Sequence, residues 1–249
     1  AGSRGRRGLV SAITRADELG TKRDIWRVFR GSPSGRVILP VVAVLVVVRV
    51  LLGRWGWADL AVVVAVGLLT GPVEWTIHLH LLHASPDAWT SRRLGLGSGH
   101  REHHLDPPEI RWLMLPGLDA GIFLVVLGVW TLMWAPLVIW AVTAMLGGAF
   151  FAPLVTALAV TAAGLGHYEW VHLLDHTTYR PRTRHYARLA RNHRWHHYRN
   201  ERYWLGITSH LGDRIMRTLP RTAGEVPLSG TARTLGLDPE PDRGPVIAD

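Results

Sequence analysis

The chain has 249 residues, a hydrophobic fraction of 48% and a formal net charge of +9 with histidine counted as neutral. It has no cysteine, which excludes disulfides, iron–sulfur clusters and a thiolate-ligated haem. The many arginines flank long apolar runs instead of interleaving with soluble aromatic residues, so we expect a membrane protein without a nucleic-acid partner.

The first segment, residues 1–36, is polar and rich in arginine. It has no short apolar core followed by a small-residue cleavage site, so it does not resemble a removable signal peptide. We expect a basic N-terminal arm with one helix at about residues 11–29.

Two apolar runs follow, at residues 37–53 and 57–73, separated by Gly53 and Arg54. Each is shorter than the roughly 20 residues that a membrane span needs. Together they suit a tight transmembrane hairpin with flanking residues at the interface. A pair of buried core helices is the alternative interpretation.

The region 113–166 is a much longer apolar run, in which Asp119 is the one charged residue. It is long enough for two spans, with a break near Pro136 or at Gly147-Gly148. A soluble domain of this size has no core that could bury such a run. The sequence therefore predicts an all-α polytopic membrane protein with four transmembrane helices in two hairpins.

Two polar, histidine-rich segments, 74–112 and 167–221, flank this second hairpin and would form a helical head. We expect them to complete a membrane domain over residues 37–221, followed by an irregular tail over 222–249 that is rich in Pro, Gly and Asp. Because two crossings separate the segments, both lie on one side of the membrane. Their arginine content, against Arg54 alone in the outer turn, predicts that this side is cytoplasmic in a bacterial plasma membrane, with both termini there.

The histidines of these segments fall into four motifs with short, regular spacing. They are His78 and His83; His100, His103 and His104; His172 and His176; and His193, His196 and His197. Positions i, i+3 and i+4 share one face of a helix, so each H-x2-H-H triplet directs three imidazoles into one sector. Imidazole suits iron, zinc, copper and nickel, and the ten side chains suffice for two ions.

Two points of this pattern stay open: how the first motif binds, and which carboxylates support the ligands. His78 and His83 lie about 140 degrees apart on an ideal helix, so they need a bend, a frayed turn or separate ions. His80 could replace His78 as a ligand, because it lies three residues before His83. Histidines outside the four motifs are more often packing residues than ligands. Glu169, Asp175 and Asp106 are candidates for hydrogen bonding to metal-bound imidazoles, and direct ligation by Glu169 or Asp175 stays open.

These residues resemble the fatty acid hydroxylase superfamily, the integral-membrane His-box proteins that include fatty acid 2-hydroxylases and sterol desaturases. The likeness covers residues 74–218 and includes Gly206, Asp213 and Thr218 after the last motif. It implies four transmembrane helices, a cytosolic head, and a dimetal centre held by the ten histidines. Tyr168-Glu169 and Thr177 depart from the usual pattern, which leaves the subfamily open.

The expected activity is oxygen-dependent hydroxylation of a lipid acyl chain at a non-haem di-iron centre, with O2 as co-substrate. Electrons would come from an external reductase, ferredoxin or cytochrome. Desaturation or methyl oxidation of a sterol or isoprenoid at the same centre is the alternative. A zinc-dependent membrane hydrolase is a second alternative function. Zinc found in a purified sample would not exclude iron in the cell, because imidazole sites bind both metals.

Overall fold

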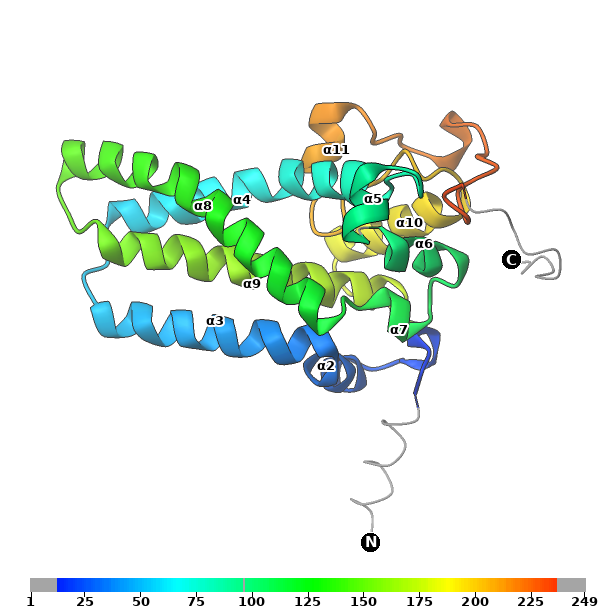
Figure 1. Cartoon of the computed structure of the whole chain (residues 1–249), viewed down its shortest axis with the longest axis horizontal. Helices are drawn as coiled ribbons and strands as arrows, with labels where there is room; N and C mark the ends of the chain where they lie inside the picture. Colours follow the sequence, from blue (N-terminus) through cyan, green and yellow to red (C-terminus); the bar gives the residue numbers. More distant parts are fainter. Residues whose placement is uncertain (1–12, 96, 237–249) are drawn as a thin grey trace, which may run out of the picture.

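The computed structural model describes residues 13–95 and 97–236, and the regular secondary structure of these residues is helical apart from one isolated β-bridge between Arg15 and Glu109. Four long helices form a bundle, and shorter helices gather at one end of it as a head (Figure 1). The first twelve and last thirteen residues of the expected arm and tail lie outside the described residues. In place of one helix over 11–29, the described part has a 3-10 helix, Ala16–Glu18, and α2, Lys22–Gly31.

The four long helices are apolar enough to cross a membrane. They are α3 (Pro33–Leu52), α4 (Trp57–Ile77), α8 (Gly117–Leu146) and α9 (Phe151–Asp175). The chain turns at Gly147 and Gly148, which have φ of +70° and +126°, while Pro136 stays inside α8. Of the two expected break points, the glycine pair is therefore the right one.

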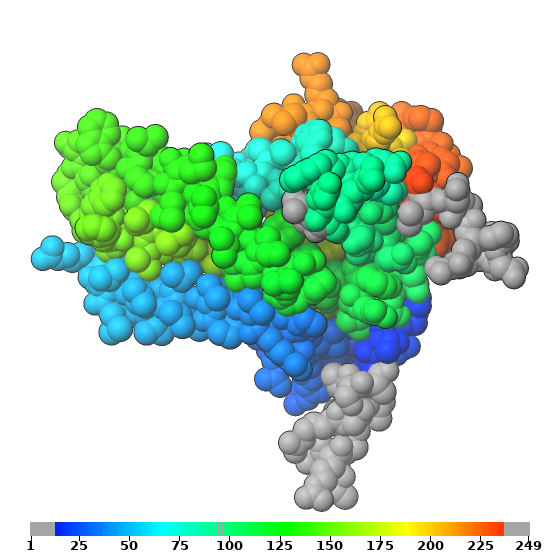
Figure 2. All heavy atoms as spheres, in the orientation of Figure 1, coloured from blue at the N-terminus to red at the C-terminus, as the bar shows by residue number. Residues whose placement is uncertain are grey.

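Helix α9 is the central element of the bundle, since it packs against α3, α4 and α8. Its buried face is rich in small residues, including Ala152, Ala157 and Ala162, which let helix backbones approach closely in a membrane. Large apolar side chains such as Leu51 and Met133 are exposed. In the space-filling view α8 forms a broad outer face of the bundle, which suits contact with lipid (Figure 2).

A buried polar cluster joins three helices at the end of the bundle opposite the head. Arg49 of α3 forms an ion pair with Asp59 of α4, at 2.7 Å between Nη2 and Oδ1. Thr156 of α9 donates to the same carboxylate oxygen at 2.5 Å. Charges inside a membrane are retained where they pair with one another, so this cluster fixes the two hairpins together.

Asp59→Leu is expected to lower the melting temperature of the purified chain, because it leaves the Arg49 guanidinium buried and uncompensated. Breaking one partner of a buried pair costs about 3–5 kcal/mol. Thermal unfolding in detergent, followed by tryptophan fluorescence, measures the change. Arg49→Leu combined with Asp59→Leu should recover most of the loss, and a double variant as unstable as Asp59→Leu would contradict this account.

The head is built from the ends of the long helices and several short ones. A π-helical turn, His78–Leu82, continues α4, and it is followed by α5 (Trp89–Leu94), α6 (Ser98–Leu105) and α7 (Ile110–Leu113). After α9 come α10 (Arg184–Tyr198), α11 (Leu211–Met216) and a 3-10 turn, Ala223–Glu225. Helix α9 does not end at residue 166 but continues to Asp175, so a membrane helix carries part of the head directly.

Candidate metal centre

The ten histidines of the four motifs converge in the head and form two neighbouring groups. The first histidine group contains His78, His83, His100, His104 and His196. The second histidine group contains His103, His172, His176, His193 and His197. In each group the potential ligand atoms all lie within 4.8 Å of one another, so each group is able to bind a metal ion.

Each H-x2-H-H triplet is divided between the two groups. His100 and His104 of α6 belong to the first group, while His103 faces the second. The triplet of α10 is divided the other way, with His196 alone in the first group. The sequence spacing predicted that the three rings of a triplet share one sector of their helix. The two groups adjoin, since the ring centroids of His104 and His197 lie 4.2 Å apart, so one helix face can serve both groups.

The π-helical turn explains how His78 and His83, which lie on different faces of an ideal α-helix, can bind the same ion. The backbone N–H of His83 donates to the carbonyl of His78, five residues earlier, at 3.1 Å. This wider turn brings residue 83 close to residue 78 along the helix, and their ring centroids lie 4.8 Å apart. The required bend is therefore local. His80 points elsewhere: it is exposed, packs against Trp75, and belongs to neither group.

Hydrogen bonds on the outer side of the rings fix the tautomers of the first group. Nδ1 of His78 lies 2.7 Å from the carbonyl of Leu205, and Nδ1 of His104 lies 2.7 Å from that of Ala232. Nδ1 of His196 likewise lies 2.9 Å from the carbonyl of Tyr203. A carbonyl can only accept, so these nitrogens carry the ring proton. The Nε2 lone pairs therefore face the centre of the group, as a metal requires.

Burial keeps the imidazoles uncharged. It is the main reason that the pKa of His104 falls to about 3, and that the pKa of His100 and His197 lies well below the usual value. Repulsion from neighbouring imidazoles lowers the latter two further. Neutral rings keep their lone pairs at neutral pH and are ready to ligate.

Close approaches between ring nitrogens show that both groups suit a cation. Nε2 of His78 lies 3.1 Å from Nε2 of His100, and in the second group Nε2 of His176 and His193 are 2.8 Å apart. In the first pair the proton of His78 is committed to Nδ1, so its Nε2 lone pair faces another ring nitrogen. Within the described residues, Nε2 of His104 is also buried without a hydrogen-bond partner, which leaves its lone pair free for a cation, and the donor set is all imidazole. The residues therefore fit two metal ions.

Of the three carboxylates expected beside the ligands, Asp106 is directed elsewhere. Its side chain pairs with Arg15 at 3.0 Å near the surface, because the N-terminal segment is hydrogen bonded to the turn between α6 and α7 at this point. Glu169 is buried and accepts from the backbone N–H of Leu115 at 3.1 Å. Asp175 is also buried, and within the described residues neither of its oxygens has a hydrogen-bond partner. Among residues 13–95 and 97–236, none of these three carboxylates forms a hydrogen bond to a histidine.

Two other carboxylates hold the loop that supports His78. Asp213 accepts from the backbone N–H groups of Leu205 and Gly206, at 3.0 and 2.8 Å, and from the Thr218 hydroxyl at 2.6 Å. This explains the Gly, Asp and Thr positions noted after the last motif. Glu74 accepts from the backbone N–H and the hydroxyl of Thr208 and was missed in the sequence. Its position directly after an apolar run, one turn before His78, is the signal that could have marked it.

Asp213→Ala is expected to reduce metal bound at the first histidine group without removing a ligand. It leaves two backbone N–H groups and one hydroxyl without their acceptor, each at a cost of about 1–3 kcal/mol, and it loosens the carbonyl that orients His78. Metal content per chain by mass spectrometry checks this. The matched control is Asp87→Ala, at an exposed position on the head, and equal metal content in the two variants would contradict the expectation.

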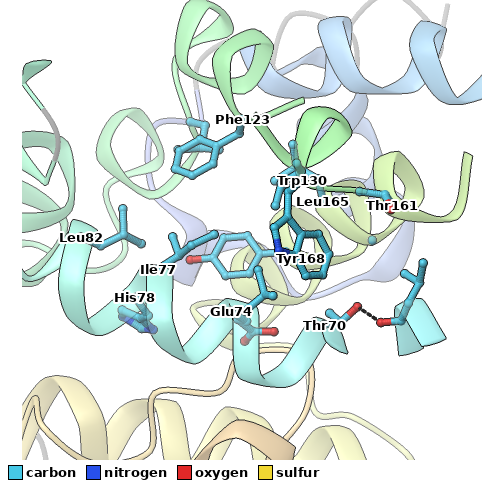
Figure 3. Close-up of a pocket in the computed structure, with 15 residues that line it drawn as sticks. Thr70, Glu74, Ile77, His78, Leu82, Phe123, Trp130, Thr161, Leu165 and Tyr168 are labelled. Carbon is cyan, nitrogen blue, oxygen red and sulfur yellow. Dashed lines mark hydrogen bonds between the residues drawn. The ribbon is translucent and has the colours of Figure 1, made fainter. Parts of the chain in front are cut away.

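A long apolar cavity runs between α4, α8 and α9 and reaches His78 (Figure 3). Along α4 it extends from Val66 to Leu82, a helix length of about 24 Å. Its volume is only about 100 Å³, so it is narrow. Trp130 and Thr161 line it within the bundle, while His78 lies at its head end.

The fold and the site together define a class: a helical membrane protein with two adjoining all-histidine metal groups at the head of its spans. The sequence profile of the fatty acid hydroxylase family matches residues 63–218, which is more than half of the chain. The chain belongs to this family of His-box oxidoreductases. No match was found among curated proteins or among solved structures.

Proposed function

We propose that the chain is a non-haem di-iron monooxygenase that hydroxylates the acyl chain of a membrane lipid. The observation that carries this proposal is the narrow apolar cavity that leads from the bundle to His78. A flexible acyl chain fits a long, narrow space, whereas a rigid, fused-ring sterol needs a wider one. Family membership supports the reaction class, and the two histidine groups supply the ligands.

The iron ligands in this proposal are the ten histidines of the two groups, listed above. Bound iron would activate O2 with two electrons from an external donor and two protons from solvent, so that one oxygen atom enters a C–H bond and the other leaves as water. The protein's own contribution is to position and to exclude water: the cavity places a chain carbon beside His78, and its apolar walls keep solvent from the site.

The orientation of the protein is part of the same proposal. The head segments carry most of the arginines, and the outer turn carries Arg54. By the positive-inside rule the head would face the cytoplasm of a bacterial cell, where a reductase, ferredoxin or cytochrome can reach it.

The test is comparative lipidomics of cells with an active or an inactive copy, grown under ¹⁸O2. Hydroxylation predicts a lipid that gains one labelled oxygen in the active strain alone. A product that loses two hydrogens without label would favour the desaturase. Activity retained in the absence of oxygen would favour the zinc hydrolase and overturn the proposal.

A further inference from the structure

A second hollow lies on the head, outside both histidine groups. It encloses about 360 Å³ between the first half of α10 and α11. Its walls include Arg184, His185 and Arg188 on one side, and Ser209, His210 and Arg214 on the other. All of these side chains can donate a hydrogen bond, and the three guanidinium groups carry a permanent positive charge.

Within the described part of the chain, no carboxylate compensates the positive charge of this hollow. Among residues 13–95 and 97–236, Arg184, Arg188 and Arg214 form no ion pair with a carboxylate. The pKa of the buried His210 is lowered to about 4. Burial is the main cause, and repulsion from His185 and from nearby arginines lowers it further. Three clustered guanidinium groups without a counter-charge form a site for an anion, and their planar donors match phosphate oxygens.

His210 is held in one tautomer by its neighbour Asn192. The side-chain oxygen of Asn192 accepts from Arg191 at 3.2 Å, which directs the amide nitrogen toward Nε2 of His210, 2.9 Å away. The amide nitrogen can only donate, so Nε2 accepts and the proton of the neutral ring lies on Nδ1. The neutral His210 ring, which lines the hollow, therefore keeps its one N–H at Nδ1.

The hollow lies at the level where the bundle meets the head. Helix α11 packs against α4 at Gly71, where a Cβ would come within 3.0 Å of Cβ of Leu211 (Figure 1). Gly71 precedes His78 by seven residues, so this contact is about 10 Å nearer the middle of the membrane than the metal ligands. On the other wall, Tyr186 of α10 is hydrogen bonded to His167 of α9 at 3.1 Å. Both walls therefore rest on membrane helices at their inner ends.

Exposed apolar side chains next to Arg214 point to a lipid environment. Ile215 and Met216 of α11 are 56% and 44% exposed, on a short helix that stands beside a membrane span. In the headgroup region these side chains would contact acyl chains while the arginines face the phosphates. A soluble acidic protein would meet this rim only by displacing lipid.

We propose that the hollow between α10 and α11 binds the phosphate group of an anionic phospholipid in the leaflet on the side of the head. The site is separate from the narrow apolar cavity between α4, α8 and α9, which we call the acyl cavity because an acyl chain is its proposed occupant. It would hold α10, which carries three of the ten histidines of the two groups, at a fixed depth against the membrane surface.

The test is native mass spectrometry of the full, metal-loaded chain in neutral detergent with an equal mixture of phosphatidylglycerol and phosphatidylcholine. The wild type should retain phosphatidylglycerol in preference. Arg184→Gln, Arg188→Gln and Arg214→Gln together should reduce its retention at least fivefold. The matched control is Arg92→Gln, Arg93→Gln and Arg202→Gln, which removes the same charge at exposed positions outside the hollow.

Metal content and melting temperature, measured in the same samples, show that each variant is folded. Equal retention of phosphatidylglycerol in the two triple variants would overturn the proposal. So would release of the lipid by inorganic phosphate at millimolar concentration, because the ligand would then be a free phosphate. Binding of an acidic electron-transfer protein that the first triple variant abolishes, with lipid retention unchanged, would also overturn it.

Discussion

His78→Ala should abolish product formation and lower the metal content from two ions per chain toward one. His78 is fully buried, its Nδ1 proton is committed to Leu205, and its Nε2 faces His100 in the first histidine group. Loss of this nitrogen removes a ligand and leaves a void among the remaining four rings. We expect activity to fall on the order of 100-fold or more, which exceeds the usual effect of losing a group that merely supports a ligand.

His80→Ala is the matched control for this experiment. His80 lies on the same π-helical turn, two residues away, but it is exposed and outside both groups. It should keep both metal ions and nearly all activity. The pair of variants also decides between the two histidines as ligands in the first motif. Full metal content in His78→Ala, with loss in His80→Ala, would refute the arrangement.

Gly164→Phe should stop hydroxylation while both metal ions remain bound. Gly164 of α9 lines the acyl cavity, and a Cβ placed there meets no atom within 4 Å. A phenyl ring can therefore enter the cavity without displacing the backbone, and it would occupy the space that the proposed acyl substrate needs. The expected pattern is a loss of product with unchanged metal content and melting temperature.

Gly67→Phe provides the control for the blocked cavity. Gly67 of α4 also has open space around a Cβ, but it is exposed on the outer face of the bundle and does not line the cavity. Its phenyl ring would face lipid and should leave activity unchanged. Product formation by Gly164→Phe at the wild-type rate would show that the substrate reaches the site by another route.

The helical class and the four spans could be predicted because they depend on local properties. Apolar runs of sufficient length at 37–53, 57–73 and 113–166 leave few alternatives to membrane helices, and the structure has four helices that are long and apolar enough to cross a membrane. The flexible φ of Gly147 and Gly148 marks the turn of the second hairpin. Helix ends were less predictable. The stretch after residue 166 is polar, but α9 continues because its buried face still packs against neighbouring helices.

The candidate site was predictable in composition but not in arrangement. The motifs identified ten histidines, and the structure brings these ten together. The sequence could not show how each triplet divides between the two groups, since that depends on the positions of α6 and α10 relative to each other. The partners of the rings were also hidden, because Leu205, Tyr203 and Ala232 act through backbone carbonyls that any residue has. Asp106 was misleading, since proximity in sequence placed it beside a motif while Arg15 takes its carboxylate.

The carbonyl of Ala232 has a consequence for how the protein matures. It is the acceptor for His104, yet it follows the last histidine motif by thirty-five residues. While the chain is being synthesised, all ten imidazoles leave the ribosome before this acceptor does. His104 therefore obtains its final orientation only when the segment after α11 has been made and has closed over α6. Loading of the first histidine group would accordingly be a late event, after insertion of the spans.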